Sequence, residues 1–450
     1  MKPGFYTIMA AQFFSSLADN ALLIAAIALL RESHSPGWMT PSLKLFFVVS
    51  YVVLAAFVGA FADSRPKGRV MLITNWIKIG GCLLMLFGSH PLVAYAVVGF
   101  GAAAYSPAKY GILTELLPPE KLVIANGWIE GTTVTSIILG IALGGALVSQ
   151  RVSSVLLGFD LPLIDTGVDT PAESAMAVVV GIYLLAALFT LHIPDTGAVY
   201  PRQETNPMRL VSDFAHCCRV LWLDKLGQIS LAVTTLFWAA GATLQFIVLE
   251  WADKALGLNL SQSALLQAVV AVGVALGAVL AATRVPLRRS LSVLPVGAMM
   301  GVVVLVLSFY NRDVAPHGGF MIGHMQIMWY MVFACMLLLT VGAMAGYFVV
   351  PMNALLQHRG HVLMSAGHSI AVQNFNENLG ILVMLGVYAL LVKFSLPIAW
   401  VITIFGVFVM STMLLVMRRH ASNQRQFDSV SLIPDGSAHH APAHHPQRPS

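Results

Sequence analysis

Long apolar stretches of about 20 residues recur along almost the whole chain and alternate with short polar segments. A helix needs about 20 residues to cross the hydrocarbon core of a bilayer, so each stretch predicts one membrane-spanning helix. Twelve spans are expected, near residues 5–31, 43–62, 69–88, 91–115, 121–149, 174–193, 227–250, 262–283, 290–309, 325–350, 363–393 and 396–417.

The composition agrees with this pattern. Of 450 residues, 58% are hydrophobic and 10% are charged, and the mean hydropathy is +0.80. Soluble domains carry about 25% charged residues, so a soluble enzyme is excluded. Twelve spans use roughly 240 residues, which leaves no room for a large extramembrane domain. The net charge of +5 lies mainly in loops, and we expect no nucleic-acid partner.

The positions of lysine and arginine predict the orientation in the membrane. With both termini on the cytoplasmic side, eighteen of the 25 basic residues face the cytoplasm, six face the outside and Lys78 lies within a span. Cytoplasmic loops of membrane proteins carry an excess of these residues. We therefore expect both termini, the loop after the second span and the central linker to be cytoplasmic.

The two halves of the chain resemble each other. The fourth span ends GAAAYSPAKYGILTELL and the tenth ends GAMAGYFVVPMNALLQ, which aligns Pro107 with Pro351. Pro-broken helix ends can look alike by composition alone, but a repeat of half the chain also predicts two bundles with a substrate site between them, as in major facilitator transporters. We favour the repeat. The fold class is then all-α integral membrane, a major facilitator fold with twelve transmembrane helices in two six-helix bundles.

Four regions follow from this division. The polar linker contains a segment with apolar residues at helical spacing beside basic ones, which predicts an amphipathic helix on the inner membrane surface. The tail is rich in proline and histidine and should be disordered, and such histidine tracts bind metals only weakly. The regions are an N-terminal bundle (1–193), a cytoplasmic linker with the amphipathic helix (194–226), a C-terminal bundle (227–417) and a disordered cytoplasmic tail (418–450).

Motifs of catalysis are missing from the sequence. It has no GxxxxGK phosphate loop, no histidine followed five residues later by aspartate, and no GxSxG nucleophile elbow. We therefore expect no enzyme, no cofactor and no metal site.

Polar residues inside the spans are the candidate functional residues, because an ionisable group there costs roughly 2.5–3.5 kcal/mol on insertion scales. Gln12, Ser15, Ser16 and Asp19 form one stripe on the first span, with Asn20 beside it. A stripe of this kind faces the interior of a bundle. Asp19 then either contacts substrate and gates a cavity, or forms a fixed pair with Lys78 or Lys109.

Four further spans carry such residues. Lys109, with Tyr110 beside it, follows Pro107, whose ring frees backbone groups that need water or partners, so Lys109 is expected to line a cavity. The eleventh span contains AVQNFNEN, whose polar side chains form either a cavity wall or a buried hydrogen-bonded network. The candidates in the fifth, seventh and eleventh spans are Glu130, Gln245, Gln373, Asn374 and Glu377.

The runs AAQFFSSLADNALLIAAIALL, GFGAAAYSPAKYGILTELL, GYFVVPMNALLQ and AVQNFNEN closely resemble the bacterial lysophospholipid transporter family, a branch of the major facilitator superfamily. The resemblance covers roughly residues 5–417. It implies inward flipping of lysophosphatidylethanolamine and lysophosphatidylglycerol across a bacterial inner membrane. It also implies a partner, an acyltransferase/acyl-carrier-protein synthetase that restores the second chain. We expect this enzyme to be a separate protein, because this chain ends in a histidine-rich tail.

The resemblance also assigns residues. Asp19 and Lys109 match members of a membrane charge network, and Gln245 stands where the family has an arginine, so that Lys78 would have to supply the missing cation. The superfamily loop motif is retained at Gly59, Asp63, Arg65, Lys67 and Arg69, whereas Pro66 replaces a glycine. The antiporter Gly-Pro of the fifth span is missing.

These observations predict a lysophospholipid transporter that facilitates flipping without ATP, and we expect Asp19 and Lys109 to form an ion pair that opens for the headgroup. The acyl chain would stay in the bilayer, because each methylene exposed to water costs about 0.8 kcal/mol. Three alternatives remain: a proton-coupled multidrug antiporter, a membrane acyltransferase or lipase, and a non-transporting scaffold.

Overall fold

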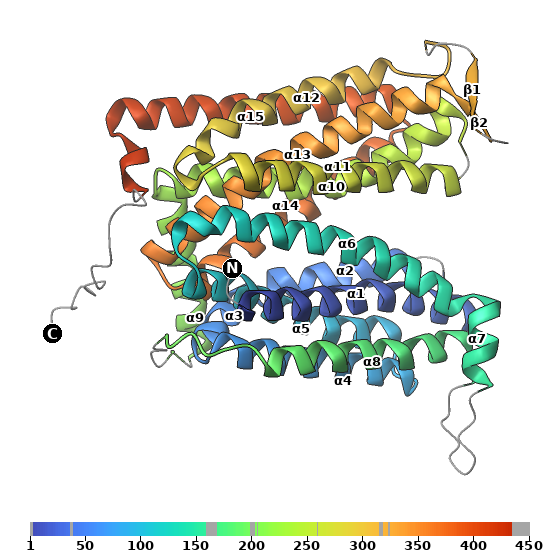
Figure 1. Cartoon of the computed structure of the whole chain (residues 1–450), viewed down its shortest axis with the longest axis horizontal. Helices are drawn as coiled ribbons and strands as arrows, with labels where there is room; N and C mark the ends of the chain where they lie inside the picture. The colour runs from blue at the N-terminus through green and yellow to red at the C-terminus, as the bar shows by residue number, and fades with distance from the viewer. Residues whose placement is uncertain are drawn as a thin grey trace.

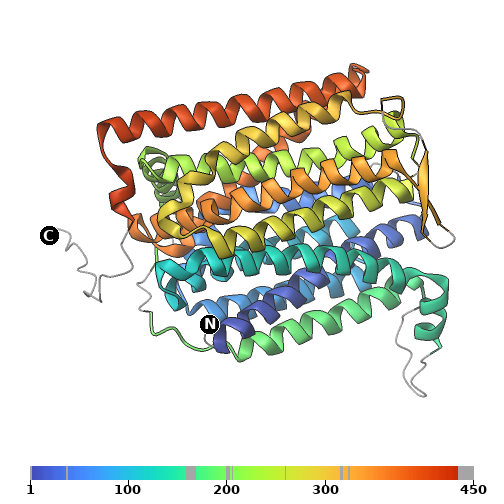
Figure 2. The same ribbon diagram turned by 45° about the horizontal axis from the view of Figure 1, so that its top comes forward.

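The computed structural model describes residues 3–36, 39–158, 169–198, 203–204, 206–258, 260–314, 318–322 and 325–433. Its helices run side by side and form two groups, α1 to α8 and α10 to α15, joined by α9 at one end (Figure 1). Figure 2 shows the same grouping after a 45° turn. The structure thus has the two helical bundles that the sequence repeat predicts.

The N-terminal group contains six spans, one of them broken. Helices α2 and α3 form one bent span with an angle of 63° between them. A short helix, α7, lies after α6 where the sequence predicted a loop. The bounds are α1 Pro3–Glu32, α2 Met39–Val53, α3 Ala55–Asp63, α4 Lys67–Leu86, α5 Pro91–Leu116, η1 Pro119–Lys121, α6 Leu122–Val148, α7 Gln150–Leu157 and α8 Pro171–Leu191.

The C-terminal group contains the other six spans. A two-stranded antiparallel hairpin, which the sequence did not predict, precedes α13 and pairs Gly319 with Met328. The bounds are α9 Pro207–Leu223, α10 Gly227–Leu256, α11 Leu260–Arg284, η2 Leu287–Val293, α12 Leu294–Phe309, β1 Gly319–Ile322, β2 Met325–Met328, α13 Trp329–Leu363, α14 Ala366–Lys393, α15 Ile398–Gln426 and η3 Ser429–Leu432.

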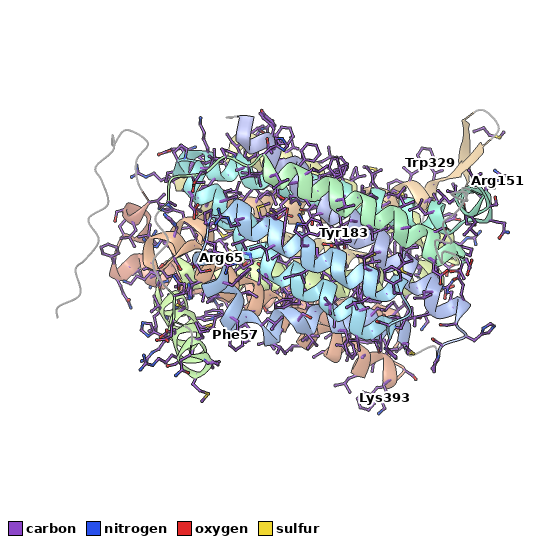
Figure 3. All side chains as sticks on the ribbon, turned by 90° about the horizontal axis from the view of Figure 1, so that it is seen from below. Phe57, Arg65, Arg151, Tyr183, Trp329 and Lys393 are labelled. Carbon is purple, nitrogen blue, oxygen red and sulfur yellow. The ribbon has the colours of Figure 1, made fainter. Side chains whose placement is uncertain are left out.

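The number of spans is as predicted. Among the described residues, eleven helices are long and apolar enough to cross a membrane, and the bent pair α2 and α3 makes a twelfth. The start of α1 and the end of α15 lie at the end of the molecule that carries α9 (Figure 1). Figure 3 places Arg65 towards this end and Arg151 and Lys393 at the other, in agreement with the predicted sidedness of the loops.

Two predicted helix ends are wrong, because in both cases polar residues of the last turns have partners on other parts of the protein. The tenth span was expected to end at 350, but α13 continues to Leu363 because its last turns are buried against the other bundle. The tail was expected to begin at 418, but α15 continues to Gln426. Arg419 and Asn423 hydrogen-bond to Gln228 and to the Lys225 carbonyl, which holds these last turns against the C-terminal bundle. The rest of the predicted tail, from 434, lies outside the described residues.

The hydrophobic core is continuous between the bundles at one end only. One cluster of buried residues joins the α9 ends of α1, α5 and α6, including Phe5, Ile112 and Leu122, to the C-terminal bundle. A second cluster lies in the opposite half of the N-terminal bundle and includes Leu22 and Tyr183. The two bundles therefore close against each other at the α9 end.

Candidate functional site

A polar cavity of about 260 Å³ lies within the N-terminal bundle. Its wall contains three lysines and one aspartate, which gives a formal charge of +2. Such a cavity attracts an anionic group. The lining residues are Gln12, Ser15, Ser16, Asp19, Asn20, Leu23, Lys44, Phe47, Tyr51, Lys78, Tyr95, Ala102, Tyr105, Ser106, Lys109, Thr133 and Ile137.

Asp19 is held by two partners in this cavity. Its Oδ2 lies 2.7 Å from Lys78 Nζ, and its Oδ1 accepts a hydrogen bond of 2.7 Å from the Tyr183 hydroxyl. The predicted pair of Asp19 with Lys109 is therefore wrong, and Lys78 supplies the cation. Lys78 reaches Asp19 because α4 lies against α1 and α8, the helices that carry Asp19 and Tyr183. Figure 3 shows Tyr183 well inside the bundle, between its two ends.

Lys78 is almost fully buried, with 2% of its side chain exposed. Its Nζ also donates to Ser15 Oγ at 3.0 Å and lies 4.9 Å from the centre of the Tyr105 ring. These contacts compensate part of the cost of taking an ammonium group out of water. Within the described part of the chain, the Tyr105 hydroxyl is buried without a hydrogen-bond partner, and Tyr105 lines the cavity, so the site contains a polar atom that a ligand can satisfy.

Lys109 lines the same cavity but has a different environment. Its Nζ lies 4.3 Å from the centre of the Tyr110 ring, which explains the neighbouring candidate Tyr110 as a support for the ammonium. Among the described residues, no carboxylate lies within ion-pair distance of Lys109. Lys109 is therefore a positive charge that is available to an incoming anion.

The polar stripe of α1 faces the other helices of its bundle, as predicted. Gln12 bonds to Thr133 and Thr132 of α6, at 2.8 and 2.9 Å. Ser16 accepts a hydrogen bond from Ser136, also on α6. Asn20 lines the cavity and donates to the Ser16 carbonyl. The stripe therefore both fixes α1 against α6 and forms one wall of the cavity.

A second, larger cavity of about 420 Å³ adjoins the first. It is mainly apolar, and Thr133 and Ile137 of α6 line both cavities. The candidates Glu130 and Gln245 lie on its wall. Gln245 Nε2 donates to Gln267 Oε1 at 3.3 Å, so this position now contributes an amide pair in place of a charge.

The polar residues of α14 form a hydrogen-bonded network between the two bundles. Glu130 accepts from Asn353 of α13 at 3.2 Å, Asn353 accepts from Gln373 at 3.0 Å, and Gln373 also donates to Glu377 at 2.7 Å. Asn374 accepts from Ser106 of α5 at 3.3 Å. Gln373, Asn374 and Glu377 line neither cavity, so the structure favours the network that was the second interpretation of this motif. Whether these residues also gate transport stays a prediction.

An amide pair lies next to this network. Asn126 of α6 and Gln357 of α13 donate to each other at 2.9 and 2.8 Å. Beside this pair, α6 also approaches α11 closely: a Cβ built on Gly127 would lie 2.5 Å from Ala282 Cβ of α11. Uncharged amides can keep two bundles together and still separate without leaving a bare charge in the membrane.

The loop motif closes the α9 end of the interface. Asp63 accepts hydrogen bonds from the backbone N–H groups of Gly367 and His368, at 2.9 and 3.0 Å, and from the Ser365 hydroxyl. It thereby caps the N-terminus of α14 on the opposite bundle, where a carboxylate is favoured. Lys67 Nζ lies 2.6 Å from Asp63 Oδ1 and fixes the carboxylate.

The remaining residues of the loop motif have different surroundings. A Cβ on Gly59 would lie 3.0 Å from His368 Cα, so the missing side chain lets α3 and α14 meet. Arg65 lies over the Phe61 ring and Arg69 is exposed. Pro66, which replaces the expected glycine, is the residue before α4 and does not disturb the motif.

The linker helix α9 contacts both bundles at this end. Asp224, directly after α9, forms a two-point pair with Arg359 of α13, with distances of 3.2 and 2.6 Å. Trp222 donates to Asn376 of α14. The linker forms a helix over Pro207–Leu223, as expected, and it is anchored to protein; its position on the inner membrane surface stays a prediction.

Sequence reasoning missed four residues of this site. Lys44 was counted as an outside loop residue, because it lies at the end of a span. Tyr183 is one aromatic residue in an apolar helix and gives no pattern. Asn353 and Gln357 were placed beyond the tenth span, although Asn353 follows Pro351 by two positions, as Lys109 follows Pro107. The internal repeat was thus the signal that pointed to Asn353.

Comparisons with known proteins agree with the fold. The profile of the Major Facilitator Superfamily matches residues 8–385. The chain is 40% identical over 392 residues to the lysophospholipid transporter LplT of Yersinia pestis (strain Pestoides F), covering 87% of each chain, and equally to that of Yersinia pseudotuberculosis serotype O:3 (strain YPIII).

Solved structures show the same fold. The E. coli fucose:proton symporter FucP superimposes with a TM-score of 0.68 at 10% identity, covering 92% of this chain and 97% of FucP. A bacterial homologue of the iron transporter ferroportin gives 0.66 at 14% identity, covering 94% of this chain and all of the other. At these identities the likeness establishes the architecture.

Proposed function

The chain belongs to the major facilitator superfamily and, within it, to the lysophospholipid transporter family, and we propose that it moves lysophospholipids from the outer to the inner leaflet of a bacterial inner membrane. The proposed cargoes are lysophosphatidylethanolamine and lysophosphatidylglycerol. The observation that supports this most directly is the polar cavity with a net positive charge, in which Lys109 has no carboxylate within ion-pair distance among the described residues. A phosphodiester is the anion that both lipids share.

The headgroup would bind in two steps. Phosphate oxygens first accept charge-assisted hydrogen bonds from Lys109, and such bonds are about twice as strong as neutral ones. The ammonium of the ethanolamine headgroup then competes with Lys78 for Asp19, and a released Lys78 turns to the phosphate. With lysophosphatidylethanolamine, Asp19 and Lys78 thus exchange one partner for another and neither is left as an unpaired charge in the bilayer.

Alternating access requires the bundles to separate at the α9 end after the headgroup has bound. The bonds that must break there include those of Asp63 with the start of α14, the Asn126–Gln357 pair and the Glu130–Asn353 contact. All of them cross the interface in the half of the molecule that carries α9. The polar cavity would then open towards the cytoplasmic side.

We further propose that both termini and α9 are cytoplasmic, as the basic residues indicate, and that flipping needs no ATP. Lysolipid that forms outside and is consumed inside supplies a downhill gradient. Consumption would fall to a separate acyltransferase/acyl-carrier-protein synthetase that adds the second chain. The function is transport, with the chemistry left to that partner.

Liposome flipping tests the proposal. Purified protein is reconstituted, labelled lysophosphatidylethanolamine or lysophosphatidylglycerol is placed in the outer leaflet, and the fraction that albumin can no longer extract is followed without any imposed gradient. Wild-type protein should protect both lipids. Lys109→Gln should slow this by about tenfold to a hundredfold, because a hydrogen bond to a charged group contributes about 1.5–3 kcal/mol.

Lys121→Gln is the matched control, because Lys121 is exposed outside the cavity. It should flip at the wild-type rate. No protection of either lipid by the wild type would refute the proposal. Flipping only with an imposed proton gradient, together with transport of cationic dyes, would support the proton-coupled antiporter instead.

A further inference from the structure

Arginines gather at the α9 end of the C-terminal bundle. Segments 284–309 and 398–433, which the structure describes throughout, contain six arginines and one carboxylate, that of Asp428, and these groups give a formal charge of +5. All six arginines are exposed, and none lines either cavity. They belong to the end of α11, to η2 and to the last turns of α15, and together they form the arginine patch: Arg284, Arg288, Arg289, Arg418, Arg419 and Arg425.

The contact between α12 and α15 brings these elements to the same end of the bundle. A Cβ built on Gly297 would lie 2.6 Å from Met413 Cε, and one built on Gly301 would lie 2.8 Å from the backbone N of Met410. The two helices therefore run antiparallel. Both η2, which directly precedes α12, and the last turns of α15 lie on the α9 side of this contact.

The patch begins where the apolar outer surface of α15 ends. Leu414 and Leu415 are exposed large apolar side chains, as expected for a surface that faces lipid. Arg418 lies three residues beyond Leu415, which is about 4.5 Å further along the helix axis. The polar headgroups lie directly beyond the hydrocarbon core. The arginine patch is therefore at the level of the phosphate groups in the leaflet on the α9 side.

Most of these guanidinium groups have donors to spare. The side chains of Arg284, Arg289, Arg418 and Arg425 form no ion pair or hydrogen bond with other described residues. Arg419, in contrast, donates to Gln228 of α10 and helps to hold the end of α15 in place. A guanidinium group is planar and carries five N–H donors that fit two oxygens of a phosphate at once.

We propose that the arginine patch is a binding site for the phosphates of anionic phospholipids, such as phosphatidylglycerol, in the leaflet on the α9 side. A zwitterionic headgroup gains less there, because its cationic end meets arginines and a single carboxylate. Each basic residue close to an anionic membrane surface contributes about fivefold in affinity, which corresponds to about 1 kcal/mol. The site lies outside both cavities, so it does not depend on the proposed cargo.

Photo-crosslinking beside the patch tests this site in the full-length protein. Benzoylphenylalanine replaces Leu415, which is 61% exposed and lies next to Arg418, and the protein is placed in nanodiscs of equal parts phosphatidylglycerol and phosphatidylcholine. With the native arginines, crosslinks to phosphatidylglycerol should exceed those to phosphatidylcholine by at least about fivefold, the contribution of a single basic residue. A second series with cardiolipin in place of phosphatidylglycerol shows which anionic lipid is preferred.

The triple variant Arg284→Gln, Arg289→Gln and Arg418→Gln should bring the two yields to about equal, because it removes three of the charges that attract phosphate. Arginine to lysine at the same positions keeps the charges and should retain most of the preference. The matched control removes three charges at the opposite end of the molecule, where Arg31, Arg151 and Lys393 are also exposed, and should leave the preference unchanged.

Two further measurements keep the result decisive. The melting temperature in phosphatidylcholine nanodiscs should be the same for the triple variant and the wild type, because the three side chains have no described partners. High salt should reduce the preference without any substitution, since it screens exposed charges. Equal yields in the wild type, a preference that salt does not change, or a preference retained in the glutamine variant would overturn the lipid site. The patch would then act as an orientation signal or as a docking surface for an acidic protein.

Discussion

We predict that Asp19 and Lys78 stabilise the folded protein as a pair, so that removing one of them lowers the free energy of unfolding more than removing both. Asp19→Asn keeps the size of the side chain and removes its charge. Lys78 then keeps only neutral oxygen acceptors, Ser15 Oγ at 3.0 Å and the amide oxygen of the new asparagine, together with its ring contacts. The ammonium remains where only 2% of its side chain is exposed.

The magnitude follows from the burial of the two partners. Removing one partner of a fully buried pair costs about 3–5 kcal/mol, because the other charge is left uncompensated. Asp19 is 18% exposed, and its exposure to the cavity places the cost at the low end, about 3 kcal/mol. Lys78→Met should cost a similar amount. The double variant removes both charges and should cost about 1 kcal/mol, which leaves a coupling free energy of several kcal/mol.

Unfolding of the four proteins in detergent measures this cycle. Lys254→Gln is the control, because Lys254 pairs with Glu250 at 2.5 Å but is 54% exposed, and exposed pairs contribute at most about 1 kcal/mol. Single-variant costs that simply add in the double variant would refute the coupling. Flipping gives the second criterion: the double variant should be folded but inactive, and wild-type flipping by it would reduce the pair to a structural role.

Three other predictions use the closed end of the interface and the outer loop. Asp63→Asn should weaken the cap on α14, because hydrogen bonds to a charged group contribute about 1.5–3 kcal/mol each. A cysteine introduced as Ser106→Cys should then react faster with a thiol reagent added from the α9 side. An unchanged rate would contradict the assigned closure. Burial raises the pKa of the Cys218 thiol to about 11. In Cys217→Ser protein, labelling of Cys218 by maleimide should therefore be slow at pH 7, and its rate should rise about tenfold per pH unit, as followed by mass spectrometry. Rapid labelling at pH 7 would show that α9 is not held against the bundles. A cysteine at Ser154 should react with an impermeant probe from outside the cell, and reaction from the cytoplasmic side alone would invert the orientation.

The number and the approximate extent of the spans could be predicted because a bilayer requires a fixed length of apolar helix. The ends of α13 and α15 could not, since Gln357, Arg359 and Arg419 look like loop residues by composition. They can be helical because their side chains hydrogen-bond to residues outside their own helices: Asn126, Asp224 and Gln228. Hydropathy records the cost of a polar side chain in lipid and contains no information about the partner that removes this cost.

The candidate site shows the same division. Asp19, Lys78 and Lys109 stand out in the sequence because charges within spans are expensive. Which lysine pairs with Asp19 depends on the rotation and depth of α4 and α5 against α1, and the structure assigns Lys78 to Asp19. Gln373 and Asn374 likewise stand out, but only the packing of α14 against α13 and α5 shows that they bond to Asn353 and Ser106 of those helices.

The sequence by itself therefore determined the solvent of this protein, its twelve spans, its two related halves and the charges that need an explanation. Each of these depends on properties that neighbouring residues along one helix share. Tertiary structure alone decided the Asp19–Lys78 pair, the cap of Asp63 on α14 and the meeting of a polar with an apolar cavity at Thr133 and Ile137. These features join helices that are far apart in the chain, and their geometry is set by how the helices pack, which no local pattern encodes.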